Sequence, residues 1–176
     1  ERVYDESLAW AKIYDKELEE MLSDKEYSLK ELGIERGNVK PRKDIAKWSD
    51  VKYIISYMYA DKFDKNGEFE YQKITDENEI NNIVKTYFEK YYDESDDKQV
   101  WFDKMKDLAE EVGFAREVKE WKQEPEKWPG HVGDISTVIR VALTSRSNTP
   151  DMYEIMQVLG SKRVIQRLEK AIENLK

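Results

Sequence analysis

The feature that most constrains the fold of this chain is the spacing of its apolar residues. In segment after segment, apolar side chains recur three or four positions apart, which places them on one face of an α-helix. One such stripe consists of Ile80, Ile83, Val84, Tyr87 and Tyr91, and the last consists of Val164, Leu168, Ala171 and Leu175. Because helices bury such stripes against one another, the pattern predicts an all-α fold of about eight helices.

Capping residues suggest where these helices begin and end. A serine or threonine hydroxyl can accept a hydrogen bond from a free N–H group of a first turn, and glycine readily ends a helix in a left-handed conformation. Helix starts are expected at Ser23, Thr75, Thr149–Pro150 and Ser161, and helix ends at Gly33, Gly113 and Gly160.

Two segments interrupt the helical pattern. Gly67–Ile74 alternates apolar and charged residues as a strand does, and we interpret it as a loop or a marginal hairpin arm. The sequence EPEKWPGHVGD, residues 124–134, holds two prolines and two glycines, which indicate a loop or a domain boundary. We therefore expect two helical subdomains, residues 1–97 and 98–176, that meet near residues 95–130.

The charge of the chain is unevenly distributed. The formal net charge is -8, which argues against the generally basic surface of a non-specific nucleic-acid binder. Residues 34–48 nevertheless hold five basic and two acidic side chains, and residues 135–176 hold seven basic and four acidic. Residues 61–99 hold six basic and twelve acidic side chains. Two basic segments in an acidic chain fit a local contact with RNA, although the same charges could simply solvate helix faces.

Several classes of protein are excluded by what the sequence lacks. It contains no cysteine, so disulfides and thiolate zinc sites are excluded. No apolar run approaches the ~20 residues that span a bilayer, and the acidic N-terminal segment does not resemble a signal peptide. We expect a cytoplasmic protein without a membrane contact.

The sequence offers little for catalysis. His131 is the single histidine, and its Gly- and Pro-rich surroundings favour a capping or surface role over a catalytic one. Phosphate-binding glycine motifs are absent, and no pair of carboxylates stands out as an acid and a base. We expect no catalytic residue, no metal site and no cofactor in these residues.

The segment RVALTSRSNTPDMYEIMQVLG, residues 140–160, is the strongest candidate for binding. A polar turn lies between two apolar runs, and the helix expected after it would present free N–H groups and a positive dipole end. Arg140, Arg146 and Asn148 precede that helix, and such side chains can stack on unpaired bases or hydrogen-bond to their edges. The alternative is a capped helix–helix turn with an incidental arginine.

The C-terminal part of the chain resembles a known family. HVGDISTVIRVALTSRSNTPDMYEIMQVLGSKRVIQRLEKAI, residues 131–172, is similar to the C-terminal end of bacterial-type glutamyl-tRNA synthetases. That ending has an Arg-x-Ala-Leu-Thr segment, a Thr-Pro before a helix, Val-Leu-Gly and an Arg-rich last helix. Residues 1–22 and 34–59 resemble, more loosely, the segments that follow the catalytic half in that family. The resemblance covers nearly the whole chain.

This resemblance implies the helical anticodon-binding part of a longer enzyme. The parent would be a class I aminoacyl-tRNA ligase that joins glutamate to tRNA with ATP and Mg²⁺. Its His-Ile-Gly-His-like and Lys-Met-Ser-Lys-Ser-like motifs are not in these residues, so we expect this chain to bind RNA without ligating. Residues 1–97 would form the stem-contact and first anticodon-binding subdomain, and residues 98–176 the C-terminal one. The partners would be the anticodon loop of tRNA-Glu and the catalytic half, and we expect a monomer.

Carried over residue by residue, the resemblance assigns roles within the 140–160 segment. Arg140 would contact a base or its phosphate, and Met152 would pack on a base face. Thr149 and Pro150 would shape the pocket. The expected RNA-binding set also includes Arg146, Asn148, Arg36 and Arg42.

The sequence departs from the family at two points. Ser145 stands where glycine is common, so we expect the backbone of the turn to differ or its φ to be negative. Lys162 in LGSKRV makes the first turn of the last helix more basic, which opposes the helix dipole. A helical protein-interaction module without an RNA-reading role is the alternative function, and the acidic segment at residues 61–99 favours it.

Overall fold

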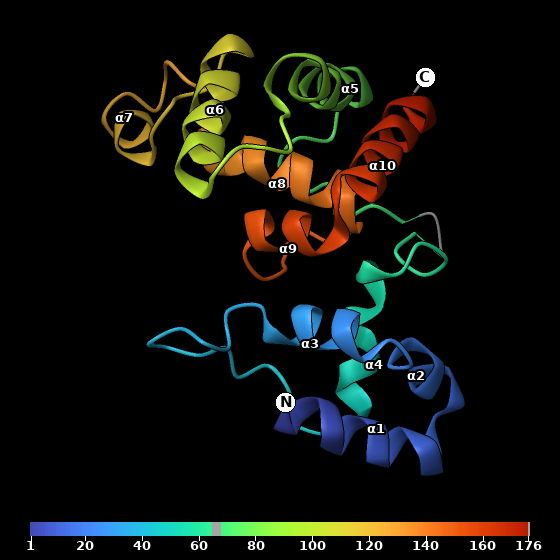
Figure 1. Ribbon diagram of the computed structural model, residues 1–176. Coiled ribbons are helices and arrows are strands. Elements are labelled where there is room, and N and C mark those ends of the chain that lie inside the picture. The colour runs from blue at the N-terminus through green and yellow to red at the C-terminus, as the bar shows by residue number, and fades with distance from the viewer. Residues whose placement is uncertain (65–67, 176) are drawn as a thin grey trace. The chain divides into compact units, whose positions relative to one another are not determined.

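The computed structural model describes residues 1–64 and 68–175. Within these ranges the chain forms ten α-helices, a short 3-10 helix and a π-helical turn, and no strand (Figure 1). The all-α prediction is therefore confirmed for the described residues. The elements are α1 (Arg2–Tyr14), α2 (Lys16–Met21), α3 (Lys25–Gly33), α4 (Ser49–Ile55), η1 (Ser56–Met58), α5 (Glu77–Thr86), η2 (Tyr87–Tyr91), α6 (Lys98–Glu111), α7 (Val118–Gln123), α8 (Val132–Thr144), α9 (Met152–Leu159) and α10 (Ser161–Asn174).

The helices form two compact units. The first comprises Glu1–Gly67 and Pro150–Leu159, and the second comprises Glu68–Thr149 and Gly160–Lys176. This division differs from the boundary expected at residues 97 and 98, because α5 packs on α8 and α10 and so belongs to the second unit. It also assigns α9 to the first unit, where α9 contacts α3. Contacts between segments far apart in the sequence set this division, and a local pattern carries no information about them.

The first unit is built around α1 to α4. Asp15 separates α1 from α2, because its backbone is extended and its carboxylate accepts a hydrogen bond from the Leu18 amide at 3.1 Å. The tryptophans Trp10 and Trp48 pack, partly buried, against the core of this unit. The buried core residues are Tyr4, Ala11, Leu18, Met21, Leu22, Leu32, Val51 and Ile55.

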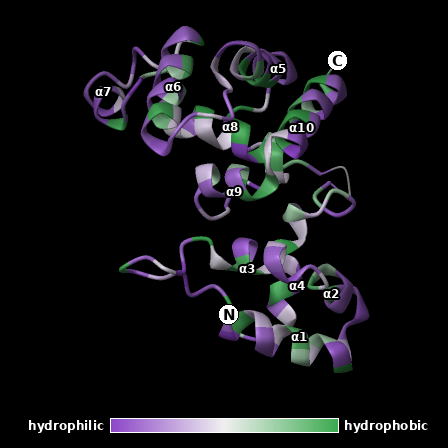
Figure 2. Cartoon of the chain, in the orientation of Figure 1, coloured by the Kyte–Doolittle hydropathy of each residue, from purple (hydrophilic) through white to green (hydrophobic). Residues whose placement is uncertain are grey.

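The second unit is organised around α8. Helices α5, α6 and α10 all contact α8, as Figure 1 shows. Hydrophilic and hydrophobic stretches alternate along α6 and α10 in Figure 2, as expected for helices with one face on a core. A backbone bridge joins the segment between α6 and α7 to the start of α8, since Val132 N donates to the Ala115 carbonyl at 2.9 Å. The buried residues of α8 are Val132, Asp134, Ile135, Val138, Ile139, Val141, Ala142, Leu143 and Thr144.

Aspartates cap several helices where hydroxyl residues were expected. Asp24, not Ser23, accepts a hydrogen bond from the first turn of α3, and Asp76, not Thr75, does so for α5. A carboxylate accepts the same bond as a hydroxyl and adds a negative charge at the positive end of the helix dipole. Both predicted caps were therefore wrong by one residue.

The predicted glycine and serine positions have mixed outcomes. Gly113 and Gly160 adopt φ values of 87° and 78°, so both end or precede a helix in the conformation that favours glycine. Gly33 is instead the last residue of α3, with Ile34 as its cap. Ser161 is the first residue of α10 and makes no capping bond, because Gly160 occupies the cap position.

The segment from Glu68 to Ile74 runs as a loop without strand pairing, as predicted, and Gly67 lies outside the described residues. Among the helices that the structure describes, none is both long enough and apolar enough to cross a membrane.

Candidate nucleic-acid interface

The start of α8 is held by a capping box formed by His131 and Asp134. The His131 Nδ1 atom accepts a hydrogen bond from Gly133 N at 3.0 Å, and the Asp134 carboxylate accepts one from His131 N at 3.0 Å. The Lys73 ammonium lies 2.7 Å from the other Asp134 oxygen. Burial would raise the pKa of Asp134, but the hydrogen bonds from Lys73 and His131 outweigh it and hold this pKa below its usual value. His131 is thus a capping residue, as expected.

The end of α8 turns sharply at Ser145. This residue has φ 63° and ψ -3°, which is the left-handed conformation, and its amide donates to the Val141 carbonyl at 2.7 Å. The expectation of a negative φ was therefore wrong: serine here adopts the backbone that glycine favours. Thr144 supports the turn, because its hydroxyl donates to the Arg140 carbonyl at 2.7 Å and accepts from Arg146 N at 3.2 Å.

Arg140 is bonded directly to Thr149, the residue that follows this turn. The Arg140 Nη1 atom donates to the Thr149 hydroxyl at 2.6 Å and to the Thr149 carbonyl at 2.9 Å. The two contacts from one nitrogen hold the two ends of the Arg140–Thr149 segment together, so that this segment forms a closed loop. The sequence pointed to these two residues separately, and the structure joins them.

A strap formed by residues 68–74 holds the same loop from another side. The Glu70 carboxylate accepts hydrogen bonds from the Ser147 amide at 2.8 Å and from the Ser147 hydroxyl at 3.0 Å. Glu70 N donates to the Ser145 carbonyl at 3.0 Å, and Gln72 Nε2 donates to the Ser147 hydroxyl at 3.1 Å. The loop between α8 and Thr149 is therefore preorganised by contacts to residues far away in the sequence. Glu70 and Gln72 precede Ser147 by 77 and 75 residues.

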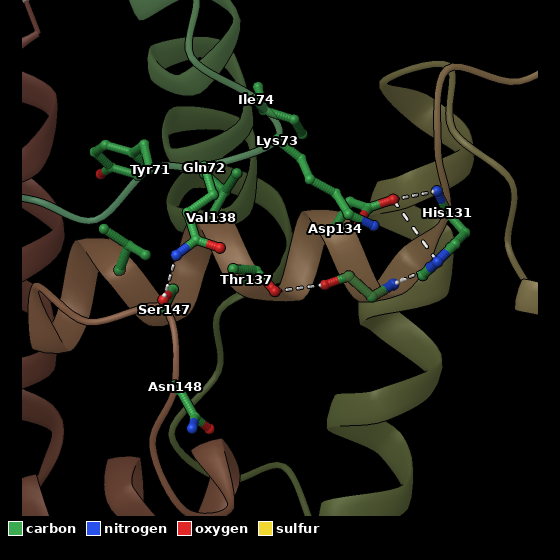
Figure 3. Close-up of a pocket in the computed structure, with 12 residues that line it drawn as sticks. Tyr71, Gln72, Lys73, Ile74, His131, Asp134, Thr137, Val138, Ser147 and Asn148 are labelled. Carbon is green, nitrogen blue, oxygen red and sulfur yellow. Dashed lines mark hydrogen bonds and ion pairs between the residues drawn. The ribbon is translucent and has the colours of Figure 1, made fainter.

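Strap, helix and loop enclose a pocket of about 450 Å³ (Figure 3). In the figure the strap residues lie along one side of α8, with His131 at one end of the helix and Ser147 towards the other. The pocket is lined by Tyr71, Gln72, Lys73, Ile74, His131, Gly133, Asp134, Thr137, Val138, Val141, Ser147 and Asn148.

The contacts between the strap and the loop are not evident from the sequence. Its alternating pattern in Glu68–Ile74 does indicate an extended segment, but nothing local predicts that Glu70 and Gln72 reach Ser147. The capping box of His131 and Asp134 is easier to predict from the sequence, because an acidic residue three positions after a cap is a recognised helix-start pattern.

The remaining expected residues of the 140–160 segment differ in exposure. Asn148 is exposed, whereas Arg146 and Pro150 are half-buried. Met152 is only 3% exposed, because it lies on the inner face of α9 with Ile155 and Met156. Its side chain therefore offers little surface to a base in this structure. Asp151, rather than Thr149, caps α9, since it accepts a hydrogen bond from the Glu154 amide at 3.0 Å.

The arginines of the first basic segment are occupied within that segment. Arg36 Nη2 lies 2.5 Å and Arg42 Nε 3.0 Å from the two oxygens of Asp44. Arg36 also donates to the carbonyl oxygens of Leu32 and Arg42. The two side chains are only 17% and 12% exposed. Both residues thus organise the loop before α4, and the structure does not single either out as a base contact.

One arginine of the C-terminal basic segment is internal. Arg167 on α10 is 3% exposed, and its Nη1 atom donates to the Leu143 carbonyl at 2.7 Å. That carbonyl lies in the last turn of α8, where carbonyl groups have no partner within the helix. Arg167 therefore stabilises the helix end that precedes the loop. One of the seven basic side chains in residues 135–176 is therefore buried.

Nowhere in the described parts of the chain do three or more His, Asp or Glu side chains gather as a metal site would require. A preorganised polar loop, an arginine fixed at its base and an adjoining pocket form a surface that can receive a flat polar ligand without large rearrangement.

A comparison with known protein families identifies the family of this chain. The anticodon binding domain family matches residues 16–172. Since the match covers most of the chain, the protein belongs to this family.

Several glutamate–tRNA ligases are similar to this chain. One from Clostridium perfringens is 41% identical over 173 residues, which are 97% of this chain and 31% of that protein. One from Acetivibrio thermocellus is 39% identical over 176 residues, and one from Sorangium cellulosum is 37% identical over 171. These cover 98% and 97% of this chain, and 31% and 30% of the two ligases. The chain thus spans about a third of the length of these relatives. No solved structure matches it.

Proposed function

We propose that this chain binds the anticodon loop of a glutamate-accepting tRNA as the anticodon-reading region of a glutamate–tRNA ligase. The observation that carries the proposal is the Arg140–Thr149 contact in a member of the anticodon binding domain family. Arginine and threonine side chains that are held in one geometry can read the exposed edges of unpaired bases at a low entropic cost.

The length of the relatives supports a separation of binding from catalysis. The ligases from Clostridium and Acetivibrio extend well beyond the region that this chain matches. We propose that ATP-dependent ligation, with its Mg²⁺ requirement, belongs to that remaining region, and that this chain contributes binding without catalysis. In this proposal the chain acts as a monomer in the cytoplasm, with the tRNA and the catalytic half as its partners.

The affinity of the chain alone should be modest. A tRNA bound at both its acceptor end and its anticodon gains avidity from the two linked sites, and this chain provides one of them. We expect a dissociation constant in the micromolar range or weaker, which corresponds to about -8 kcal/mol or less favourable.

The test is a titration with two RNA hairpins by fluorescence anisotropy. One hairpin carries the glutamate anticodon loop, and the other has its three anticodon bases changed. The proposal expects tighter binding to the matched loop, and affinity that falls with salt at a log–log slope of about -0.7 for each phosphate contacted.

The alternative outcomes are distinct. Equal and salt-sensitive binding to both hairpins would show that basic side chains attract RNA without reading it. Absence of binding by folded protein would remove the RNA-reading role and favour a protein-interaction module instead.

A further inference from the structure

We propose that Arg167 and Glu70 together fix the point at which α8 ends, and that Arg167 is thereby a positioning residue for the loop of residues 145–149. Neither side chain needs to touch RNA in this role. The effect on binding rests on the proposed function, because the shape of the loop matters only if the loop contacts the anticodon. The position of the helix end can be tested without RNA.

The end of α8 is a strained point of the backbone. Ser145 has a φ of 63°, in the left-handed region, where a residue with a side chain is less stable than in a helix. One more turn of α8 would give Ser145 helical backbone angles and remove this strain. A strained residue of this kind persists where surrounding contacts hold the backbone in place. We therefore looked for the contacts that prevent α8 from continuing past Thr144.

The hydrogen bond that would extend α8 runs from the Ser147 amide to the Leu143 carbonyl, four residues before it. Both of these groups are already bonded elsewhere. The Ser147 amide donates to the Glu70 carboxylate at 2.8 Å. The Leu143 carbonyl accepts from Arg167 Nη1 at 2.7 Å. Glu70 thus occupies the donor, and Arg167 the acceptor, of the same helix-extending bond.

Of these two contacts, the one from Arg167 is the harder to replace by water. Arg167 is 3% exposed and Leu143 is fully buried, so a Leu143 carbonyl without the guanidinium would be a buried acceptor in need of a donor. Glu70 is exposed, and water can bond to the Ser147 amide in its place. Loss of Arg167 therefore favours the Ser147 amide as the new donor to Leu143, which adds a turn to α8.

The burial of a charge also fits a role at the helix end. The other buried residues of α10 are Val164, Leu168 and Ala171. A methionine of similar length could pack among them without the cost of burying a charge. The last turn of α8 carries the negative end of the helix dipole, where a cation is stabilised. The guanidinium thus matches what the end of α8 requires, beyond what packing requires.

A longer α8 would change the loop that the proposed function needs. Residues 145–151 now run as turn and loop backbone, and this path brings the Thr149 hydroxyl within 2.6 Å of Arg140 Nη1. An added turn advances along the helix axis by about 5.4 Å and draws residues 145–148 out of this path. The contact between Arg140 and Thr149 would then be lost, and with it the fixed orientation of Arg140.

Three variants separate this role from general stability. Arg167→Met removes the guanidinium and keeps an apolar side chain of similar length. Leu168→Ala is the matched control, because it destabilises the same buried face of α10 and leaves Arg167 bonded to Leu143. Ser145→Gly is combined with Arg167→Met as a rescue, since glycine adopts the left-handed backbone without strain. Circular dichroism and thermal melting establish that each variant is folded.

The first measurement is the NMR Cα chemical shifts of residues 145–148 in the absence of RNA. Arg167→Met should move these shifts towards helical values, and the added Ser145→Gly should return them towards the wild type. Leu168→Ala should leave them as in the wild type. Wild-type shifts in folded Arg167→Met would overturn the proposal, as would an equal change in Leu168→Ala.

Glu70→Ala tests the same helix end from an exposed position, where folding is not at risk. Arg167 still occupies the Leu143 carbonyl in this variant, so residues 145–148 should keep their non-helical shifts while the Ser147 amide exchanges faster. Helical shifts in Glu70→Ala would show that Arg167 does not hold the helix end. This result decides the matter even if Arg167→Met does not fold.

The second measurement is the preference for the matched over the changed-anticodon hairpin, by fluorescence anisotropy. Arg167→Met should lower this preference by about 2- to 30-fold, and the added Ser145→Gly should restore part of it. Leu168→Ala should keep the wild-type preference. A change in stability alone would lower binding to both hairpins alike and leave their ratio unchanged.

The failures of the two proposals can be told apart. If the wild type shows no preference between the hairpins, the proposed function fails, and the chemical shifts still decide whether Arg167 fixes the end of α8. If the wild type shows the preference and Arg167→Met retains it, the positioning role is overturned and the anticodon-reading function stands.

Discussion

The Arg140 guanidinium donates from a single nitrogen to both the hydroxyl and the carbonyl of Thr149, at 2.6 and 2.9 Å. The contact joins the last turns of α8 to the residue at which the chain leaves the second unit. The contact holds the Arg140 side chain in one orientation. It also fixes the distance between the two ends of the loop that lies between Arg140 and Thr149. Affinity for RNA should therefore depend on the geometry of this pair as well as on its charge.

Arg140→Ala should weaken binding of the matched anticodon hairpin by about 1–3 kcal/mol, because it removes the side chain that we propose contacts a base or its phosphate, together with the Thr149 bonds that anchor the loop. Arg140→Lys keeps the charge but lacks the planar fork of donors, so most of the loss should remain. The measurement is fluorescence anisotropy, with Arg163→Ala, an exposed arginine of α10, as a control for the loss of one charge. Equal losses of binding free energy in Arg140→Ala and Arg163→Ala would show that Arg140 acts only through its charge.

Ser145→Gly should raise the free energy of unfolding by about 0.5–1 kcal/mol. Serine pays a steric cost at φ 63° that glycine does not, and the greater freedom of glycine in the unfolded chain offsets part of the gain. Ser145→Val should be destabilising, because a branched side chain is strained in this conformation. Urea denaturation measures both. A loss of stability in Ser145→Gly would mean that the Ser145 hydroxyl bond to the Thr144 carbonyl, at 2.6 Å, outweighs the strain.

Glu70→Ala should speed hydrogen exchange at the Ser147 amide, because this amide donates to the Glu70 carboxylate at 2.8 Å. The exchange rates of the α8 core amides should stay unchanged, since the strap contacts the loop and not the helix interior at this point. Glu68→Ala, which removes an exposed carboxylate of the same strap, is the control. Unchanged protection of Ser147 in Glu70→Ala would show that the loop keeps its shape without the strap.

Glu17 should make the stability of the first unit depend on pH in acid. Hydrogen bonds from Lys52, at 2.6 Å, and from Lys62, at 2.8 Å, lower the pKa of Glu17 from 4.5 to about 2. Because the folded pKa lies below the unfolded one, the stabilisation is complete above pH 4.5 and is lost as the pH falls towards 2. The Glu17 side chain is 36% exposed, so solvent screening limits the effect to about 1 kcal/mol or less.

The measurement for Glu17 is urea unfolding of the wild type and of Glu17→Gln at pH 7 and near pH 3. The wild type should be the more stable at pH 7, and the difference should shrink in acid. Glu20→Gln, at an exposed position of the same helix, should show no such convergence. A difference that is constant with pH would rule out the titration of Glu17 as its source.

Local sequence patterns determined the helical character of this protein. Apolar stripes such as Ile80, Ile83 and Val84 are buried as the spacing predicts, because a helix face is set by residues within a few turns of one another. The helix-ending glycines Gly113 and Gly160 were predictable for the same reason, since their positive φ is a property of single residues. The caps at Ser23 and Thr75 were each wrong by one position, where an adjacent aspartate competes for the same bond.

The sequence also indicated that Arg140 and the turn after it are candidates for binding. Only the tertiary structure decided how these residues are arranged. The pairing of Arg36 and Arg42 with Asp44, the burial of Arg167 against Leu143 and the strap from Glu70 to Ser147 all depend on contacts across the folded chain. A charge count treats every arginine as exposed, whereas packing decides which of them face solvent. Helix formation depends on neighbouring residues, so the local sequence predicts it. The loop and its pocket depend instead on contacts between segments up to 77 residues apart.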